Sequence, residues 1–392
     1  MIKEATINHV TVRAFSRISN RNVVAKLLFT ARMYRLGVII TLECLEKNIP
    51  MKECMFKIKR FVPNQKYAHA CYERAREMYK SAKKLGKEVR KLKQWLIFEA
   101  IGDKLDKGNR NIRLSSPNEV EVVVFTKNYG IERIRIPIKP LKTHISIVRE
   151  LYELGSNKLL GYNARCVIRD YSRDKALVEF QFIVPVEIYL KYRRVYDKPR
   201  GRNIGGIDWN SDRANLVIVS TKGELLDHKT WWFPEVTSHG YPRTARRTKQ
   251  FQVLSEVTDY CYHHGCSIVV FEDPDTIKTR RFTKNSTANR KITRWTKREA
   301  SQMFVLKALR YGLKPFFVNP AYTSKLAELI AKDVGLDRHT ASAYILALEY
   351  LGLNPKRYTK TYKDLKRPTN KKQFQNPQRL WSSLNFLIPL EH

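Results

Sequence analysis

Three short segments after residue 200 place acidic side chains beside apolar runs, in a chain that is otherwise strongly basic. They are 205–210 with Asp208, 267–273 with Glu272, and 335–337 with Asp337. Burying like charges together is unfavourable unless a cation neutralises them. The fold is therefore expected to bring these carboxylates to a site that uses their charge.

The order of the predicted strands and helices around these segments narrows the fold class further. Asp208 lies in the first of three apolar runs, 205–210, 216–219 and 225–233, which predict an antiparallel meander. An amphipathic helix bearing Phe251, Leu254, Val257 and Cys261 follows, then the run ending at Glu272, which suits a strand covered on both faces. Asp337 precedes a last helix with one apolar face. Meander, helix, carboxylate strand and helix is the order of an α/β RNase H-like fold.

In that fold the carboxylates converge on the sheet, so Asp208, Glu272 and Asp337 are the predicted catalytic and metal-binding residues. Aspartate and glutamate supply the hard oxygen ligands that Mg²⁺ or Mn²⁺ prefers. Each residue has an alternative role: a turn aspartate for Asp208, an ion-pair partner for Glu272, and an N-cap for Asp337. Four neighbours remain candidate substitutes, namely Asp212, Asp273, Asp275 and Asp333.

Charge indicates the class of partner. Lysine and arginine number 74 against 37 acidic residues, a formal net charge of +37, so a polyanion is expected. A generally basic soluble protein, a membrane-surface binder and a ribosome-associated protein are the alternatives. No run approaches the roughly 20 apolar residues of a spanning helix, and residues 1–5 do not begin a signal peptide, so no membrane partner and a cytoplasmic location are expected.

The first half divides into helical and strand patterns. Residues 1–15 alternate like a strand, and helices are predicted over 23–47 and 67–101. Short alternating runs over 109–190 predict antiparallel strands, with a small barrel as one arrangement. The basic stretch 191–202, with Pro199 and Gly201, marks a domain boundary.

The predicted helix over 67–101 is dense in cations, which favours contact with a nucleic-acid backbone over an ordinary solvated face. The cations proposed for this contact are Arg74, Arg76, Lys80, Lys83, Lys84, Lys87 and Arg90. Aromatic residues among cations suit base stacking, and the candidates are Tyr67, Tyr72, Trp95, Trp231, Trp232 and Trp295.

The six cysteines form no C-x-x-C pair, so neither a disulfide framework nor a structural zinc site is expected. A metal role for the cluster Cys261, His263, His264 and Cys266 is the weaker alternative to buried core thiols.

These motifs resemble those of TnpB, the RNA-guided nuclease of prokaryotic insertion sequences, and of the related compact type V CRISPR effectors. Segments 206–208, 269–273 and 336–343 resemble the three RuvC motifs, and the family's catalytic triad then corresponds to Asp208, Glu272 and Asp337. The string 318–325 (VNPAYTSK) resembles the family's V-D-P-x-Y-T-S stretch. The family's four-cysteine zinc ribbon after this string is missing, because 325–330 continues a helical pattern.

The resemblance implies an RNA-guided DNA endonuclease whose partners are a guide RNA and a target DNA. It implies nucleic-acid contacts from the basic segment 278–298 and from the VNPAYTSK string. The residues concerned are Arg280, Arg281, Arg290, Arg294, Arg298, Tyr322 and Ser324. Alternatives are a guided DNA-binding repressor that does not cut, and an unguided accessory nuclease of transposition. The sequence does not distinguish a transposon setting from a CRISPR setting, and it leaves a homodimer open. The expected location becomes that of a nucleoid-associated protein when DNA is bound.

The resemblance also suggests a domain order: a RuvC-like nuclease domain preceded by a β-rich wedge domain with a helical recognition insertion. The expected boundaries are 1–19 for the first strands of the wedge domain, 20–107 for the helical segment, 108–200 for the rest of the wedge, 201–355 for the nuclease domain and 356–392 for a basic tail.

Overall fold

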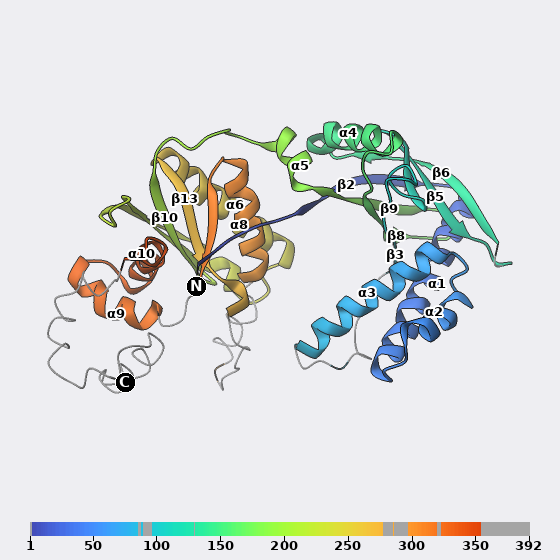
Figure 1. Cartoon of the computed structure of the whole chain (residues 1–392), viewed down its shortest axis with the longest axis horizontal. Helices are drawn as coiled ribbons and strands as arrows, with labels where there is room; N and C mark the ends of the chain where they lie inside the picture. The colour runs from blue at the N-terminus through green and yellow to red at the C-terminus, as the bar shows by residue number, and fades with distance from the viewer. Residues whose placement is uncertain are drawn as a thin grey trace. The chain divides into compact units, whose positions relative to one another are not determined.

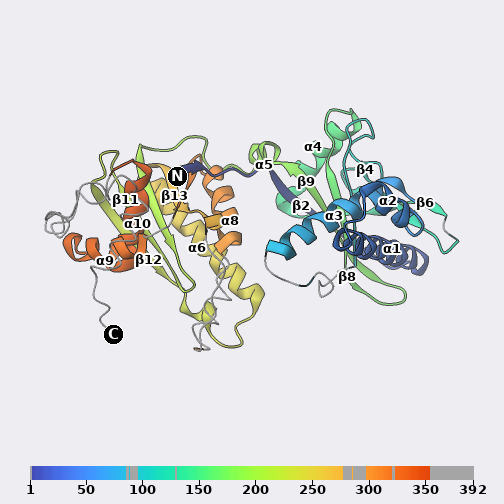
Figure 2. The ribbon, with the colours of Figure 1, turned by 60° about the horizontal axis from the view of Figure 1, so that its bottom comes forward.

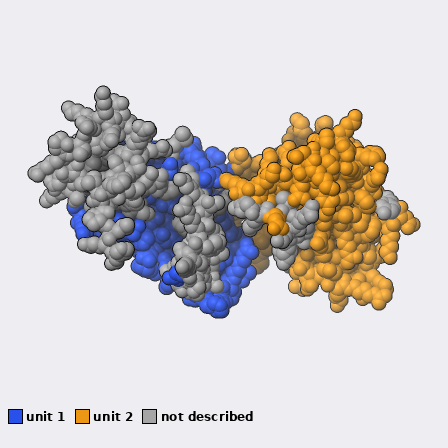
Figure 3. Space-filling view, turned by 90° about the horizontal axis from the view of Figure 1, so that it is seen from below, with its two compact units in different colours: residues 1–7, 194–392 blue, residues 8–193 orange. Residues whose placement is uncertain are grey.

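The structure is a computed structural model that describes residues 2–84, 88, 96–128, 130–276, 285, 297–319 and 323–353. The chain forms two compact units (Figure 3). Unit 1 comprises Met1–Ile7 and Arg194–His392, and unit 2 comprises Asn8–Arg193. Each unit is described by itself.

Unit 1 is built on a six-stranded sheet with the order β1-β14-β13-β10-β11-β12. Its strands are β10 (Asn203–Trp209), β11 (Arg213–Val219), β12 (Leu225–Trp232), β13 (Cys266–Glu272), β14 (Lys314–Val318) and β1 (Ile2–Glu4). The first three pair antiparallel as the predicted meander, whereas β13 runs parallel to β10 and β14 parallel to β13. This is the strand order of the RNase H-like fold, so the predicted α/β fold class is confirmed.

Helices cover both faces of this sheet (Figures 1 and 2). On one face lie α6 (Arg243–His263), which connects β12 to β13, and α8 (Lys297–Arg310), which precedes β14. On the other lies α10 (Arg338–Tyr350), which packs against β10, β11 and α9 (Thr323–Val334). Short 3-10 turns stand at Pro234–Thr237 and Pro274–Thr276.

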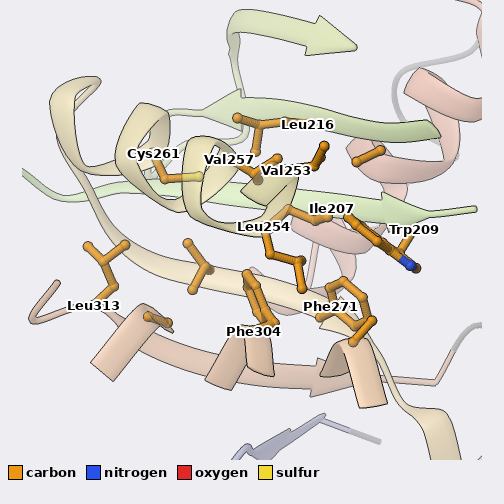
Figure 4. Packing of buried hydrophobic residues seen from close by; sticks show 14 of the residues in the cluster. Ile207, Trp209, Leu216, Val253, Leu254, Val257, Cys261, Phe271, Phe304 and Leu313 are labelled. Carbon is orange, nitrogen blue, oxygen red and sulfur yellow. The ribbon is translucent and has the colours of Figure 1, made fainter. Parts of the chain in front are cut away.

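Alternation along the strands separates the two faces. Ile207, Trp209 and Phe271 point towards α6 and α8, where they pack with Leu254 and Phe304 (Figure 4). Ile204 and Val270 belong instead to the apolar cluster that contains α10. Because successive residues of a strand face opposite sides, Asp208 and Glu272 lie on the α10 face.

Gly206 on β10 explains how closely α10 approaches the sheet. A Cβ atom at this position would stand 2.2 Å from the carbonyl oxygen of Ala343 and 3.0 Å from the Cβ of Ala347. Only glycine leaves room for the helix backbone there. The close approach brings the first turn of α10 within reach of the polar side chains of β10 and β11.

Unit 2 contains two antiparallel sheets. The five-stranded sheet has the order β3-β8-β9-β2-β7, and the three-stranded sheet has the order β4-β5-β6. The strands are β2 (His9–Ile18), β3 (Ile97–Ala100), β4 (Ile112–Ser116), β5 (Glu119–Phe125), β6 (Ile131–Pro137), β7 (Lys139–Pro140), β8 (Asn163–Tyr171) and β9 (Ala176–Pro185). The alternating runs therefore form two sheets and not one barrel.

Three helices are inserted between β2 and β3: α1 (Arg21–Glu46), α2 (Met51–Lys59) and α3 (Gln65–Lys84). Asn20 caps α1 by accepting hydrogen bonds from two backbone N–H groups of its first turn. Two shorter helices, α4 (Ile145–Ser156) and α5 (Val186–Arg193), were not predicted, and Lys142–His144 forms a 3-10 turn.

Two predicted segments differ from the structure. The helix expected over 67–101 ends at Lys84, and Ile97–Ala100 is strand β3, paired with β8. Residues 97, 98 and 100 are buried in this pairing, so tertiary packing outweighs the helical pattern. The strand expected over 1–15 is divided: β1 joins the sheet of unit 1, whereas β2 belongs to unit 2.

Two further features concern partners. No described helix is long and apolar enough to cross a membrane. All six cysteines are reduced and buried. Cys261 and Cys266 belong to the apolar core between the sheet, α6 and α8, while His263 and His264 lie within hydrogen-bonding distance of carbonyl oxygens of their own helix.

Candidate active site

Strand register places Asp208 and Glu272 side by side. Ile207 on β10 pairs with Phe271 on the parallel strand β13, so the next residue of each strand stands at the same level and on the same face. Neighbouring strands are about 4.8 Å apart. The two residues are 6% and 7% exposed. Two acidic residues are thus held together in a nearly buried position of a basic protein.

Asp208 is held by two polar neighbours. Its Oδ2 accepts a hydrogen bond of 2.8 Å from the amide nitrogen of Asn210 and lies 3.3 Å from Nδ1 of His339, on α10. The same amide nitrogen lies 3.2 Å from His339 Nδ1. Asn210 therefore fixes both the carboxylate and the imidazole.

Asp337 is the N-cap of α10. Its Oδ1 accepts hydrogen bonds from the backbone N–H groups of His339, at 2.9 Å, and Thr340, at 3.3 Å, and its Oδ2 accepts one from the Thr340 hydroxyl. Burial by itself raises the pKa of this carboxyl, but the Thr340 hydroxyl and the two backbone donors outweigh burial, and the pKa is lowered from its ordinary value. Capping occupies three of the roughly four lone-pair positions of the carboxylate.

A hydrogen-bond chain ties this cap to the sheet. The hydroxyl of Thr340 accepts a bond of 3.0 Å from the amide of Asn215, and Asn215 is the residue that pairs with Asp208 across β10 and β11. The start of α10 is thereby anchored at the level of Asp208. The structure brings Asp208, Glu272 and Asp337 to one face of one sheet.

No three His, Cys, Asp or Glu side chains in the described part of the chain are gathered closely enough to hold a metal ion. The chemistry of the donors nevertheless fits a divalent cation, because carboxylate oxygens are hard ligands. Two buried carboxylates at the same level of adjacent strands also favour an ion that balances their charge.

Three of the four substitute carboxylates lie beside cations. Asp273 forms an ion pair of 2.9 Å with Lys3, which also lies 3.6 Å from Asp275. Asp212 lies 3.2 Å from the guanidinium of Arg213, and Asp333 is an exposed residue of α9. Asp208 and Glu272 remain the pair that the sheet itself positions.

Two cations of helix α3 form ion pairs within the protein. Arg74 pairs with Glu99 of β3, which also binds Arg165 at 2.7 Å. Arg76 pairs with Glu73 at 2.8 Å. Three further cations of this helix, Lys80, Lys83 and Lys84, are exposed. Arg74 thus joins α3 to β3, and its nucleic-acid contact stays a prediction.

Several predicted contacts lie outside the described residues. They are Lys87, Arg90, Arg280, Arg281, Arg290, Arg294 and Tyr322, together with the side chains of Arg298 and Ser324.

The stacking candidates divide by burial. Tyr67 is fully buried and donates its hydroxyl to the carbonyl of Val123 at 2.9 Å, and Tyr72 is only 9% exposed, so these two belong to the core. Trp232, on edge strand β12, is 59% exposed, with the Arg213 guanidinium 4.2 Å from its ring centre. Trp95 and Trp295 lie outside the described residues.

Sequence reasoning missed the polar residues that hold the carboxylates: Asn210, Asn215, His339 and Thr340. Asn210 and His339 each lie two residues after a predicted carboxylate. This spacing is the sequence signal that could have identified them. Their contacts with one another join segments about 130 residues apart.

The fold and the geometry define a protein with an RNase H-like sheet carrying buried carboxylates, joined to a second unit of two sheets with a helical insertion. A sequence profile described as "SSO2105 N-terminal domain" matches residues 9–194, nearly the same residues as unit 2.

Relatives that match most of the chain occur in two archaea. "Uncharacterized protein SSO2105" of Saccharolobus solfataricus is 29% identical over 337 residues, covering 84% of this chain and 89% of its own. A protein of Aeropyrum pernix is 30% identical over 310 residues, covering 74% of this chain and 81% of its own. A second protein from Aeropyrum pernix is also 30% identical over 310 residues. The chain belongs to the same protein family as these archaeal relatives.

Among solved structures, a Cas12f1-sgRNA-target DNA complex overlaps with a TM-score of 0.48 and 11% identity, covering 83% of this chain and 82% of that chain. RuvC of T. thermophilus, in complex with a Holliday junction substrate, overlaps with a TM-score of 0.26 and 16% identity, covering 42% of this chain and 96% of that chain. The fold assignment rests on the strand order of the sheet and not on these overlaps.

Proposed function

We propose that the protein is a metal-dependent nuclease that cleaves DNA selected by a bound guide RNA. The observation that carries the proposal is the position of Asp208 and Glu272, each directly after the paired residues Ile207 and Phe271 on adjacent parallel strands of an RNase H-like sheet, on the face covered by α10. Asp337 is the third proposed carboxylate, contributed by that helix.

Each residue has a separate task in this proposal. Asp208 and Glu272 supply carboxylate oxygens for Mg²⁺ or Mn²⁺, and Asp337 adds a third carboxylate. Asn210 holds Asp208 in orientation through its 2.8 Å hydrogen bond. The bond of 3.0 Å from Asn215 to Thr340 keeps the first turn of α10 at the site. The bound ions would activate a water molecule and stabilise the leaving oxygen of the phosphodiester.

The polyanionic substrate follows from charge. A net charge of +37 over 392 residues exceeds what solubility requires, and Lys80, Lys83 and Lys84 form an exposed cationic end of α3. Guide dependence rests on the resemblance of the RuvC motifs and of the VNPAYTSK string to TnpB. Base pairing between guide and target would then select the sequence.

The test begins with sequencing of the RNA that copurifies with the full-length protein. DNA matching that RNA is then incubated with the complex and Mg²⁺ or Mn²⁺, with the Asp208→Asn variant as control. A discrete RNA and matched cleavage that is lost in the variant are expected. A discrete RNA with no cleavage would favour the guided repressor, whereas cleavage without any defined RNA would favour the unguided nuclease.

A further inference from the structure

An exposed tryptophan shares the face of the sheet that carries Asp208. Asn215 pairs with Asp208 across β10 and β11, and Thr230 pairs with Asn215 across β11 and β12. Residues two positions apart on a strand point to the same side, so Trp232, two positions after Thr230, lies on the α10 face. Two strand spacings across and two residues along place it about 12 Å from Asp208.

Trp232 is held by its neighbour on β11. Arg213 pairs with Trp232 across the two strands, and its guanidinium lies 4.2 Å from the centre of the tryptophan ring. Nε of this guanidinium lies 3.2 Å from Oδ1 of Asp212, which is only 8% exposed. The backbone N–H of Asn210, which holds Asp208, donates to the carbonyl oxygen of Arg213 at 2.9 Å. One short turn therefore connects the cation beside the ring to the carboxylate.

The two adjacent tryptophans of β12 differ in surroundings. Trp231 packs against the apolar core between the sheet, α6 and α8, whereas Trp232 is 59% exposed. An aromatic ring stacks on any nucleobase, and an arginine beside it adds positive charge next to the strand's phosphates. Trp232 thus combines an ordered, exposed ring with a cation, on the face that carries the carboxylates.

We propose that Trp232 is a stacking platform for an unpaired base of the DNA strand to be cut, and that Arg213 positions its ring. This inference rests on the proposed nuclease function for the identity of the ligand. A base stacked about 12 Å from Asp208 holds the DNA strand across the carboxylates. The ligand is single-stranded DNA, because the bases inside a duplex already stack on one another and present no ring face.

The first test is photocrosslinking of a short oligothymidylate that carries one 5-iodo-2′-deoxyuridine. The full-length protein is irradiated with this probe in the absence of divalent metal, and the crosslinked residue is mapped by mass spectrometry. The crosslink is expected at Trp232 and should persist in Trp232→Phe, which keeps an aromatic ring. Leu226→Ala is the matched control, because Leu226 is an exposed apolar residue of the same strand, and it should crosslink like the wild type.

The second test is the affinity for the same oligonucleotide, measured by fluorescence anisotropy. Salt of about 0.3 M weakens the phosphate contacts of a basic protein and leaves stacking in place. Trp232→Leu keeps an apolar side chain without a ring, so binding of the single strand should weaken at least about fivefold, whereas binding of a duplex should change less than about twofold.

The outcomes separate this inference from the nuclease proposal. Crosslinks that map elsewhere, or equal weakening for single strand and duplex, overturn the platform and leave the nuclease standing. Trp232→Leu that changes the oligomeric state and not the affinity for DNA also overturns it, and assigns this edge of the sheet to a second copy of the chain. A crosslink at Trp232 in a protein that cuts no DNA supports the platform and counts against the nuclease. Because the crosslink is mapped on the wild-type protein, this result does not depend on the folding of a variant.

Discussion

The two faces of the central sheet of unit 1 differ in chemistry although they share the same strands. The face towards α6 and α8 is filled by large apolar side chains, with Phe271 stacked on Phe304 at 4.9 Å between ring centres. The α10 face combines an apolar cluster with the polar group formed by Asp208, Asn215, Glu272 and the first turn of α10. The face towards α6 and α8 stabilises the sheet, and the α10 face is proposed to carry the active site.

Phe271 and Glu272 are adjacent and point to opposite faces, so they offer the sharpest comparison. Phe271→Ala should lower the free energy of unfolding by about 3–5 kcal/mol, because it removes a fully buried ring and leaves a cavity. Chemical denaturation measures this loss. A loss below about 1 kcal/mol would contradict the assignment of this face to stability.

Glu272→Gln should instead lower the cleavage rate and leave the stability nearly unchanged. Cleavage is expected to fall at least about 100-fold, or about 2.7 kcal/mol of transition-state stabilisation, since the amide lacks the charge that holds a divalent ion. The midpoint of unfolding without metal should change little. A variant that cuts at the wild-type rate would contradict the catalytic role of Glu272.

Gly206→Ala tests the close packing of α10. The new Cβ would meet the Ala343 carbonyl at 2.2 Å, so the helix must move, with a cost of about 1–3 kcal/mol. Because Asp337, the third proposed carboxylate, caps α10, metal affinity should fall together with stability. Gly240→Ala is a useful control: its φ of +75° strains alanine, yet nothing lies within 4 Å of the new Cβ. It should therefore cost stability without a loss of metal affinity.

The smallest effect is expected at the helix cap. Asp337→Ala should cost about 1 kcal/mol at neutral pH, whereas Asp337→Asn should cost less, because asparagine caps as well as aspartate. The lowered pKa of Asp337 means that its charged cap contributes stability above the unfolded pKa of about 3.9. That contribution is lost as pH falls through the lower folded pKa.

The free energies of unfolding of the wild type and Asp337→Asn, measured between about pH 2 and pH 5, test the direction of this pH dependence. The wild type should lose stability relative to the asparagine variant on acidification. Parallel curves would show that the hydrogen bonds of the Asp337 carboxylate do not favour its charged form.

The amino-acid sequence by itself determined the order of the meander, α6, β13 and α10 in unit 1. Period-two alternation at 205–233, helical spacing at 251–261 and the apolar run ending at Glu272 depend on local chain geometry, and the structure agrees with each. The helix expected over 67–101 was wrong at Ile97–Ala100, because the pairing of β3 with β8 is a contact between distant segments.

Only the tertiary structure decided which side chains meet at the site. Asn210 and His339 contact one another across 129 positions of sequence, and the approach of α10 at Gly206 makes that contact possible. Likewise, the ion pair of Arg74 with Glu99 links α3 to β3, two elements 25 positions apart in the sequence. Local patterns specify helices and strands, whereas partners across a sheet or between elements depend on register and packing, which act over the whole fold.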